Sequence, residues 1–146
     1  MASSKTILVP TDFSESSARA MEYAADYARL MDASLLIIYV SAGPQADAGE
    51  GMLHSGVAFE DRESIIRRLE TVRPDEDDVA VNHRLLSGDA GKEILRVAAE
   101  DNVDLIIMAT HGHTGLKRTL MGSVAEYVLR RSTCPVMTIK IPKAAT

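Results

Sequence analysis

Two kinds of segment alternate along the chain. Short apolar runs rich in β-branched residues and leucine predict five strands, and the stretches between the first four runs repeat apolar residues at helical spacing. The predicted strands cover residues 6–10, 34–40, 79–86, 103–109 and 135–141. Because strands that alternate with helices usually form a parallel sheet with helices on both faces, the pattern predicts an α/β fold.

The helical segments have recognisable ends. Ser14 is a favourable N-cap for a helix that runs to about Asp32, and Pro74 ends the second helix. Two further helices are predicted over residues 90–101 and 123–131. The predicted apolar stripes are Ala18, Met21, Ala25 and Ala28 in the first helix, and Ile65, Ile66, Leu69 and Val72 in the second.

The apolar pattern also indicates where the strands lie in the sheet. Residues 79–86 alternate apolar and polar side chains, as a half-exposed edge strand does. The runs around Leu36 and Ile106 are continuously apolar, so we expect these strands in the centre. Residues 41–56 are rich in Gly, Ala, Asp and Ser, which predicts a flexible connection.

Length, charge and cysteine content narrow the class of protein. A chain of 146 residues is about one domain long, and 46% hydrophobic residues suffice for a core without disulfides or structural metal. The net charge of −5 and the six aromatic residues argue against a nucleic-acid-binding surface. With a single cysteine, Cys134, and apolar runs too short for a signal peptide or a membrane span, we expect a cytoplasmic protein.

Two loops carry the candidate chemistry. In an open parallel α/β sheet, ligands bind beyond the carboxyl ends of the strands, where the strand order reverses. The first strand ends in Pro10-Thr11-Asp12, which places a carboxylate at that edge, and the fourth ends in residues 108–115. If these two strands are neighbours, both loops flank one crevice.

The second loop has a glycine pattern that suits a polyphosphate. Nine residues separate Gly112 from Gly122, and Ser123 follows directly. Glycines let the backbone approach an anion, a helix N-terminus offers unpaired N–H groups, and a serine hydroxyl adds a donor. Lys117 and Arg118 can neutralise further negative charge. A glycine-rich turn with Ser123 as an ordinary N-cap is the alternative interpretation.

Other motifs in the chain are weaker. Residues 88–92 contain two glycines and a lysine but lack the spacing of a Walker A loop. His111 and His113 lack a third anchored ligand for a metal, and Ser123 lies outside a Gly-x-Ser-x-Gly elbow. We therefore predict no catalytic residue and no metal site.

Four segments of the sequence resemble motifs of one known family. They are Ile7-Leu8-Val9-Pro10-Thr11-Asp12, Met108-Ala109-Thr110-His111-Gly112, Gly122-Ser123-Val124-Ala125-Glu126 and Cys134-Pro135-Val136. The first resembles the opening strand of the universal stress protein family, and the others resemble its C-terminal signature. The likeness covers nearly the whole chain and is weakest over residues 41–56. It implies one Rossmann-like domain over residues 1–146, similar to the adenine nucleotide alpha hydrolases, with an open five-stranded parallel sheet in the order 3-2-1-4-5.

The resemblance also implies a nucleotide site. The family's ATP-binding members carry Gly-x-x-Gly, nine residues and then Gly-Ser or Gly-Thr, whereas this chain has Ala109 in place of the first glycine. An alanine there costs on the order of 1 kcal/mol only if the position needs a positive φ, so we interpret the site as retained. By position, Asp12 would hydrogen-bond the ribose, and the backbone of Val40 would meet the adenine edge.

The remaining roles follow from the same resemblance. Pro10 and Met108 or Ala109 would line the nucleoside pocket, and the segment from Gly112 to Val124 would hold the phosphates. The full set of predicted binding residues is Pro10, Thr11, Asp12, Val40, Met108, Ala109, Gly112, His113, Gly122, Ser123 and Val124.

The expected function is that of a dimeric stress-response regulator. We expect it to bind ATP, with or without Mg²⁺, or another adenine nucleotide, with little or no turnover, because Asp12 is the one evident carboxylate at the crevice. In the family resembled, the strand equivalent to residues 135–142 pairs with its copy, which predicts a homodimer. A nucleotide-free dimeric interaction module and a slow ATPase are the alternatives, and a further protein partner stays open.

Overall fold

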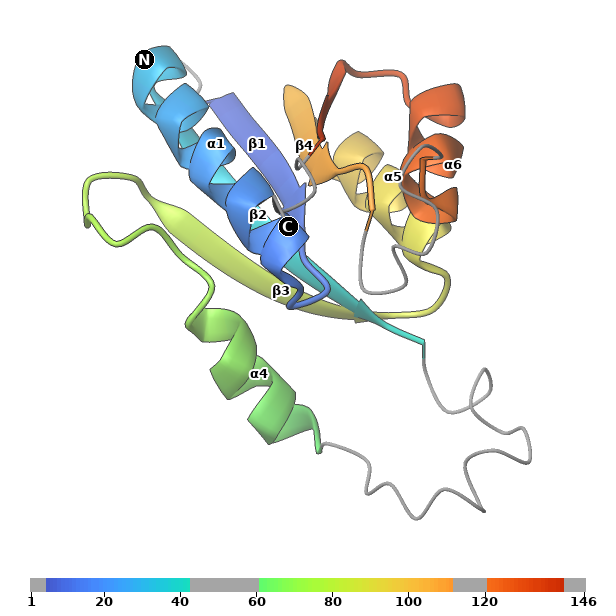
Figure 1. The fold of residues 1–146 in the computed structure, drawn as a ribbon, viewed down its shortest axis with the longest axis horizontal. Helices are drawn as coiled ribbons and strands as arrows, with labels where there is room; N and C mark the ends of the chain where they lie inside the picture. The colour runs from blue at the N-terminus through green and yellow to red at the C-terminus, as the bar shows by residue number, and fades with distance from the viewer. Residues whose placement is uncertain (1–4, 43–60, 112–120, 141–146) are drawn as a thin grey trace, which may run out of the picture.

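The computed structural model describes residues 5–42, 61–111 and 121–140. Its sheet contains five parallel strands in the order β3-β2-β1-β4-β5, which confirms the predicted fold (Figure 1). The strands are β1 (Lys5–Pro10), β2 (Ala33–Ser41), β3 (Val81–Ser87), β4 (Leu105–Ala109) and β5 (Val136–Ile139). The half-exposed strand β3 lies at one edge, as its alternating pattern predicts.

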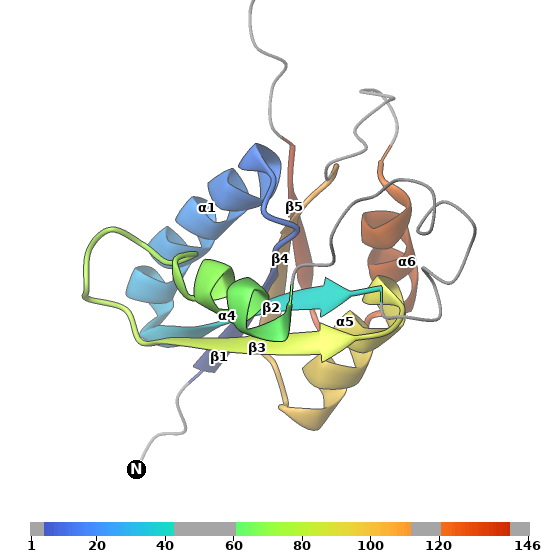
Figure 2. The same ribbon diagram turned by 90° about the horizontal axis from the view of Figure 1, so that it is seen from below.

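Helices cover both faces of the sheet. They are α1 (Glu15–Met31), α4 (Arg62–Glu70), α5 (Ala90–Glu100) and α6 (Ser123–Arg131). Figure 2 shows α1 and α4 on one side of the sheet and α5 and α6 on the other. Their bounds lie within a few residues of those predicted, and the Ser14 hydroxyl caps α1 by accepting a hydrogen bond from the Ser17 N–H at 3.2 Å.

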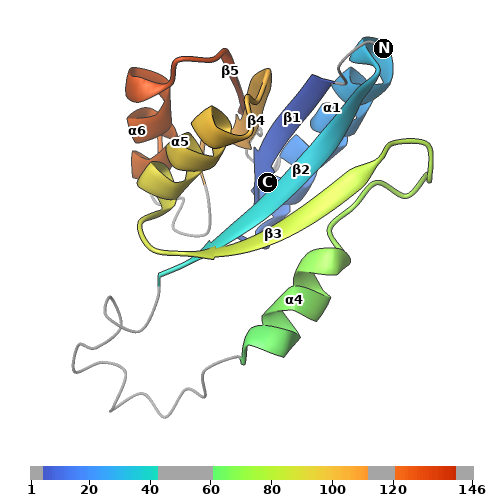
Figure 3. The same ribbon diagram turned by 180° about the vertical axis from the view of Figure 1, so that it is seen from behind.

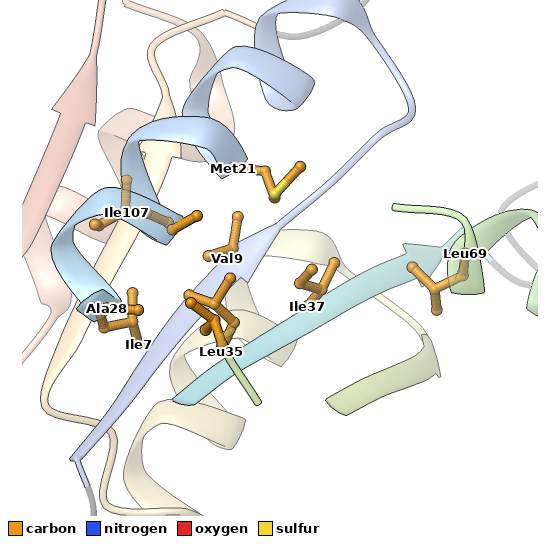
Figure 4. Close-up of a cluster of buried hydrophobic side chains, with 11 residues drawn as sticks. Ile7, Val9, Met21, Ala28, Leu35, Ile37, Leu69 and Ile107 are labelled. Atoms are coloured by element: carbon orange, nitrogen blue, oxygen red, sulfur yellow. The ribbon is translucent and has the colours of Figure 1, made fainter. Parts of the chain in front are cut away.

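Two layers of apolar side chains hold the helices on the sheet. Side chains on successive strand residues point to opposite faces, so each central strand contributes to both layers. Figure 4 shows the layer under α1, which contains Ile7, Val9, Leu35, Ile37 and Ile107 of the strands with Leu69 of α4. The layer under α5 and α6 contains Leu8, Leu36, Ile38, Ile106 and Met108. Burial on both faces explains the unbroken apolar runs of β1, β2 and β4.

The predicted stripe of α1 needs one correction. Ala18 is exposed, whereas Ala20 and Ala24 are buried beside Met21. The buried face is centred on the row that includes Met21 and Ala24, and Ala18 projects away from that row. Alanine has too little apolar surface to mark the buried face by itself, so the helical period alone placed it wrongly.

The connections bring β1 and β4 together. The chain runs outward from β1 through β2 to β3 and then returns to β4 on the other side of β1. The strand order therefore reverses between β1 and β4, where a crevice is expected at the carboxyl ends. Most of the predicted flexible connection lies outside the described residues. None of the helices within residues 5–42, 61–111 and 121–140 has the length and apolarity of a membrane span.

Candidate functional site

A cavity of about 330 Å³ lies at the carboxyl ends of β1, β2 and β4, next to the N-terminal residues of α5 and α6. Its size falls within the usual range for small-molecule sites, roughly 300–1,000 Å³. Nine of the predicted site residues line it: Pro10, Thr11, Asp12, Val40, Met108, Ala109, Gly122, Ser123 and Val124. The other two, Gly112 and His113, lie outside the described residues, as do Lys117 and Arg118.

One wall of the cavity is the loop from β1 to α1. The Thr11 N–H donates to the Ile38 carbonyl at 2.8 Å, which ties the loop to β2. The Ser14 N–H donates to Asp12 Oδ1 at 3.0 Å, and the Phe13 N–H donates to Thr11 Oγ1 at 3.1 Å. These short-range bonds give the loop a defined shape and place the Asp12 carboxylate at the edge of the cavity.

A group of buried hydroxyls supports this wall from below. Ser17 Oγ lies 3.0 Å from Thr11 Oγ1, and it donates to the Ser14 carbonyl at 2.9 Å. Thr11, Ser14 and Ser17 are the polar residues that are buried in the described chain. Each hydroxyl therefore has a partner inside the protein, as a buried polar group requires.

The second wall is the start of α6, whose N-cap is Gly122. The Gly122 N–H donates to the Thr110 carbonyl at 2.7 Å, and a Cβ at Gly122 would lie only 2.9 Å from that oxygen. Glycine is required here by this close approach and not by an unusual dihedral angle, because φ is −64°. Ser123 is the first residue of the helix, so its interpretation as an ordinary N-cap is wrong.

The N-terminus of α6 lacks the side-chain cap that the other described helices have. Ser14, Asp61 and Asp89 cap α1, α4 and α5 through their own side chains, whereas Gly122 forms no side-chain cap bond. The first N–H groups of a helix have no acceptor within the helix. Those of α6 start at Ser123 and Val124, which line the cavity.

Ala109 causes no backbone strain at the position where the ATP-binding pattern has a glycine. It is the last residue of β4, and the described non-glycine residues with positive φ are Phe13, Asp32 and Asn102. Because Ala109 does not have a positive φ, its methyl group does not carry the cost of about 1 kcal/mol that such a φ would impose.

Val40 directs its backbone toward the cavity side of β2. The Ile38 carbonyl accepts from Thr11 on the side of β1, whereas the Ser41 carbonyl accepts from Gly88 on the side of β3. Successive residues of a strand direct their backbone groups to opposite sides, so Val40 shares the direction of Ile38. Because β1 has ended at Pro10, which pairs with Ile38, the backbone of Val40 faces the space beyond the end of β1.

Several lining residues were not among those predicted. They are Ser17, Ile38, Tyr39, Ala90, Ile94, Thr110, His111 and Ala125. Ile38 and Tyr39 immediately precede Val40, and Ala125 follows Val124, so proximity in sequence could have identified them. Ala90 and Ile94 belong to α5, and the rule that helices after parallel strands begin at the ligand edge could have identified that helix.

His111 has one nitrogen that the described chain leaves unsatisfied. Its Nδ1 lies 3.1 Å from Thr110 Oγ1, whereas Nε2 is buried and has no hydrogen-bond partner among the described residues. A buried polar atom without a partner costs free energy. Within the described residues, no group of three or more His, Cys, Asp or Glu could hold a metal ion.

Comparison with known proteins agrees with the sequence pattern. A model of the universal stress protein family matches residues 3–140, which include every described element. The chain belongs to the universal stress protein family. Universal stress protein MJ0531 of Methanocaldococcus jannaschii is 35% identical over 144 residues, a match that covers 95% of this chain and 84% of that protein.

Solved structures of other family members have the same fold. That of MJ0577 from Methanocaldococcus jannaschii superposes with a TM-score of 0.77 at 29% identity, covering 96% of this chain and 98% of that one. A universal stress protein solved in complex with cAMP superposes with a TM-score of 0.67 at 23% identity, covering 94% of this chain and 98% of that one. This second likeness supports the fold.

Proposed function

We propose that this chain binds an adenine nucleotide, ATP foremost, in the cavity between the ends of β1 and β4. The observation that carries the proposal is the position of two complementary groups on that cavity. The Asp12 carboxylate lies on one wall, and the N-terminus of α6, without a side-chain cap, lies on the other. A nucleotide has hydroxyl donors at its ribose and negative charge at its phosphates, so it matches both walls.

The phosphates belong at the start of α6. The N–H groups of the first turn and the positive end of the helix dipole both favour an anion. The Ser123 hydroxyl adds a donor, and the absence of a Cβ at Gly122 keeps the chain close to Thr110. Gly112 belongs to the same proposed phosphate site by its place in the sequence.

The nucleoside belongs between β1 and β2. Asp12 can accept hydrogen bonds from ribose hydroxyls, and the backbone of Val40 can pair with the edge of adenine. Pro10, Ile38 and Met108 provide apolar surface around these groups. An apolar cavity with a few polar groups at defined places is the usual form of a small-molecule site.

The proposed role is regulation by binding, with slow turnover at most. Asp12 is the one acidic residue among the described residues that line the cavity. Rapid phosphoryl transfer normally uses a set of metal-holding, nucleophile-positioning and charge-stabilising groups. The same fold is present in a universal stress protein that was solved with cAMP, so the fold is compatible with an adenine nucleotide.

The proposal includes a homodimer. Strand β5 is an edge strand that pairs with β4, and an unpaired edge favours association with another strand. We propose that residues 135–142 pair with a second copy, with residues 141 and 142 lying outside the described ranges. Sedimentation equilibrium should then give twice the mass of one chain, and the mass of one chain would contradict the dimer. A single cytoplasmic domain with a stress-response role completes the proposal.

Isothermal titration of ATP into the purified, nucleotide-free chain tests the binding site. Ser123→Ala removes one hydroxyl from the proposed phosphate site and should weaken binding about three- to tenfold. Thr133→Ala is the matched control, because Thr133 is an exposed hydroxyl residue just beyond the other end of α6. Absence of ATP binding by the unchanged protein, or equal loss in both variants, would contradict the proposed site.

A further inference from the structure

Phe13 adopts a backbone conformation that is rare for a bulky residue. Its φ is +65°, and it lies between Asp12 and the N-cap Ser14. Residues held in the left-handed region persist only where the surroundings impose that conformation, and they often occur at functional sites. Phe13 therefore needs an interaction that holds it, and its place in the cavity loop makes that interaction relevant to ligand binding.

The ring of Phe13 lies between two partners from different elements. It stacks on Tyr39 of β2 with a centroid distance of 4.6 Å and an angle of 27° between the rings. The guanidinium carbon of Arg68 lies 4.3 Å from the centroid of the same ring. Both geometries are attractive, the first between aromatic rings and the second between a cation and a π system.

Arg68 comes from α4, which contributes no described residue to the cavity. Figure 3 shows α4 beside the edge strand β3. Leu69 is its one buried residue, and just after the helix the Val72 carbonyl lies 2.8 Å from Nε2 of His83 in β3. Because α4 buries one residue, it is a lightly held element, and the contact of Arg68 with Phe13 is one of those that join it to the rest of the fold.

Backbone hydrogen bonds on both sides of Phe13 connect its ring contacts with the shape of the cavity wall. The Phe13 N–H donates to Thr11, and the Ser14 N–H donates to Asp12. Rotation of Phe13 to a negative φ would reorient the peptide groups on both sides of it and break these bonds. The carboxylate of Asp12 would then lose the Ser14 N–H bond that contributes to its direction at the cavity.

We propose that the stack of Arg68, Phe13 and Tyr39 holds the β1–α1 loop in the conformation that presents Asp12 to the cavity. Through this stack, the position of α4 against the sheet is coupled to ligand binding. Arg68 and Phe13 are positioning residues in this account. The ligand part rests on the proposed adenine-nucleotide function, whereas the effect on the loop does not. Coupling is reciprocal, so a ligand that favours the fixed loop must also stabilise α4.

Hydrogen exchange without nucleotide tests the loop. Arg68→Met should speed exchange of the backbone amides in residues 13–17, because the cation–π interaction that restrains Phe13 is lost. Arg67→Met is the matched control, since Arg67 is a neighbouring exposed arginine that pairs with Glu63 at 3.9 Å on the same helix. Arg68 is exposed, so its replacement leaves the buried core intact. Equal exchange in the two variants would overturn the positioning role.

Titration with ATP tests the coupling. Arg68→Met should weaken binding about two- to fivefold, the size of one exposed cation–π contact, and Arg67→Met should leave it unchanged. Phe13→Leu should weaken binding at least as much, and Phe13→Tyr should restore it because the ring is kept. In the double variant, Arg68→Met should add no further loss to Phe13→Leu. An independent loss, or equal affinity of the two arginine variants, would overturn the coupling.

Different results would contradict the proposed function and the proposed coupling. If the unchanged protein binds no ATP, the proposed function and the coupling to this ligand are both wrong, and hydrogen exchange without nucleotide still decides the positioning of the loop. If it binds ATP, the nucleotide should slow amide exchange in residues 62–70, and Arg68→Met should reduce that protection. Unchanged exchange of α4 on binding would overturn the coupling alone.

Discussion

The two helices that begin on opposite walls of the cavity have contrasting N-termini. The Ser14 hydroxyl caps α1 and accepts a hydrogen bond from Ser17 N–H, whereas α6 begins at Gly122 without a side-chain cap. One N–H of the first turn of α1 is thus satisfied by a side chain of the protein itself. The first turn of α6 has no such cap, its residues line the cavity, and its N–H groups are available to a ligand. The same kind of helix start is therefore capped by the protein on one wall, and on the other it is where we propose that a ligand binds.

The helix α5 follows the pattern of α1. Asp89 caps it by accepting from the Lys92 N–H at 3.0 Å, although Ala90 and Ile94 line the same cavity. A helix N-terminus near the cavity is therefore insufficient to identify an anion site. The N-cap residue distinguishes α6 from α1 and α5, and substitutions that change it give the strongest tests.

The largest effect is expected at Gly122. In Gly122→Ala the new Cβ would lie 2.9 Å from the Thr110 carbonyl oxygen, so the chain must move away from β4. Such overpacking should lower the free energy of unfolding by about 1–3 kcal/mol. The displaced first turn should also lower ATP affinity by at least about tenfold, the equivalent of one hydrogen bond to a charged group. Chemical denaturation and calorimetry measure the two effects.

Gly91→Ala is the matched control for Gly122→Ala. A Cβ at Gly91 would lie 2.6 Å from Cδ1 of Tyr127, where α5 packs on α6. Gly91 does not belong to the described lining of the cavity. We expect a comparable loss of stability with ATP affinity close to that of the unchanged protein. A similar loss of affinity in both variants would show that instability, and not the cavity wall, causes it.

A smaller effect is expected at Ser14. Ser14→Ala removes the cap of α1 and should lower the free energy of unfolding by about 1 kcal/mol, whereas Ser14→Gly should cost only a few tenths of that amount. The bond to Asp12 comes from the backbone N–H of Ser14, so ATP affinity should change little. Urea denaturation of the two variants measures the difference. Equal stability of Ser14→Ala and the unchanged protein would remove the proposed contrast between α1 and α6.

The smallest effect we expect is the pH dependence of the stability that Glu93 of α5 contributes. Hydrogen bonds from Arg96 lower the pKa of Glu93 below its ordinary value of 4.5. Glu93 therefore stabilises the fold above that pH, and its contribution fades as the pH falls through the lowered pKa. The unchanged protein should be slightly more stable than Glu93→Gln at pH 7, and the difference should vanish in acid. Denaturation curves across this pH range measure the change.

The neutral cap of α1 is the control for this titration. The difference in unfolding free energy between the unchanged protein and Ser14→Ala should stay constant over the same pH range, because the Ser14 hydroxyl does not titrate there. A stability difference at Glu93 that persists below the lowered pKa would show that packing, and not charge, causes it.

The alternation of apolar runs and helical stripes was sufficient to predict a parallel α/β sheet with helices on both faces, whereas its strand order was predicted from the family resemblance. The apolar sides of the central strands, the N-cap at Ser14 and the start of α6 at Ser123 all depend on local pattern. The prediction that both loops flank one crevice also depends on topology. The observed neighbours β1 and β4 satisfy that condition.

Other features depend on distances that local pattern does not contain. The need for glycine at position 122 arises from the approach of Thr110, and the stack on Phe13 joins residues from α4 and β2. The phase of the α1 stripe was also misplaced at Ala18, because several alanines fit more than one helical face. Such features are set by tertiary packing between segments that lie far apart in sequence.

We expect the phosphates of an adenine nucleotide to bind at the first turn of α6. Backbone amide NMR of the ¹⁵N-labelled protein during titration with ATP detects binding at the N–H groups of this turn. We predict the largest shift changes at Ser123, Val124 and Ala125, and smaller changes at Ser17, which lines the cavity but whose N–H already donates to the Ser14 hydroxyl. If saturating ATP causes no shift changes at the start of α6, or causes its largest changes at the start of α1, the phosphates do not bind at α6.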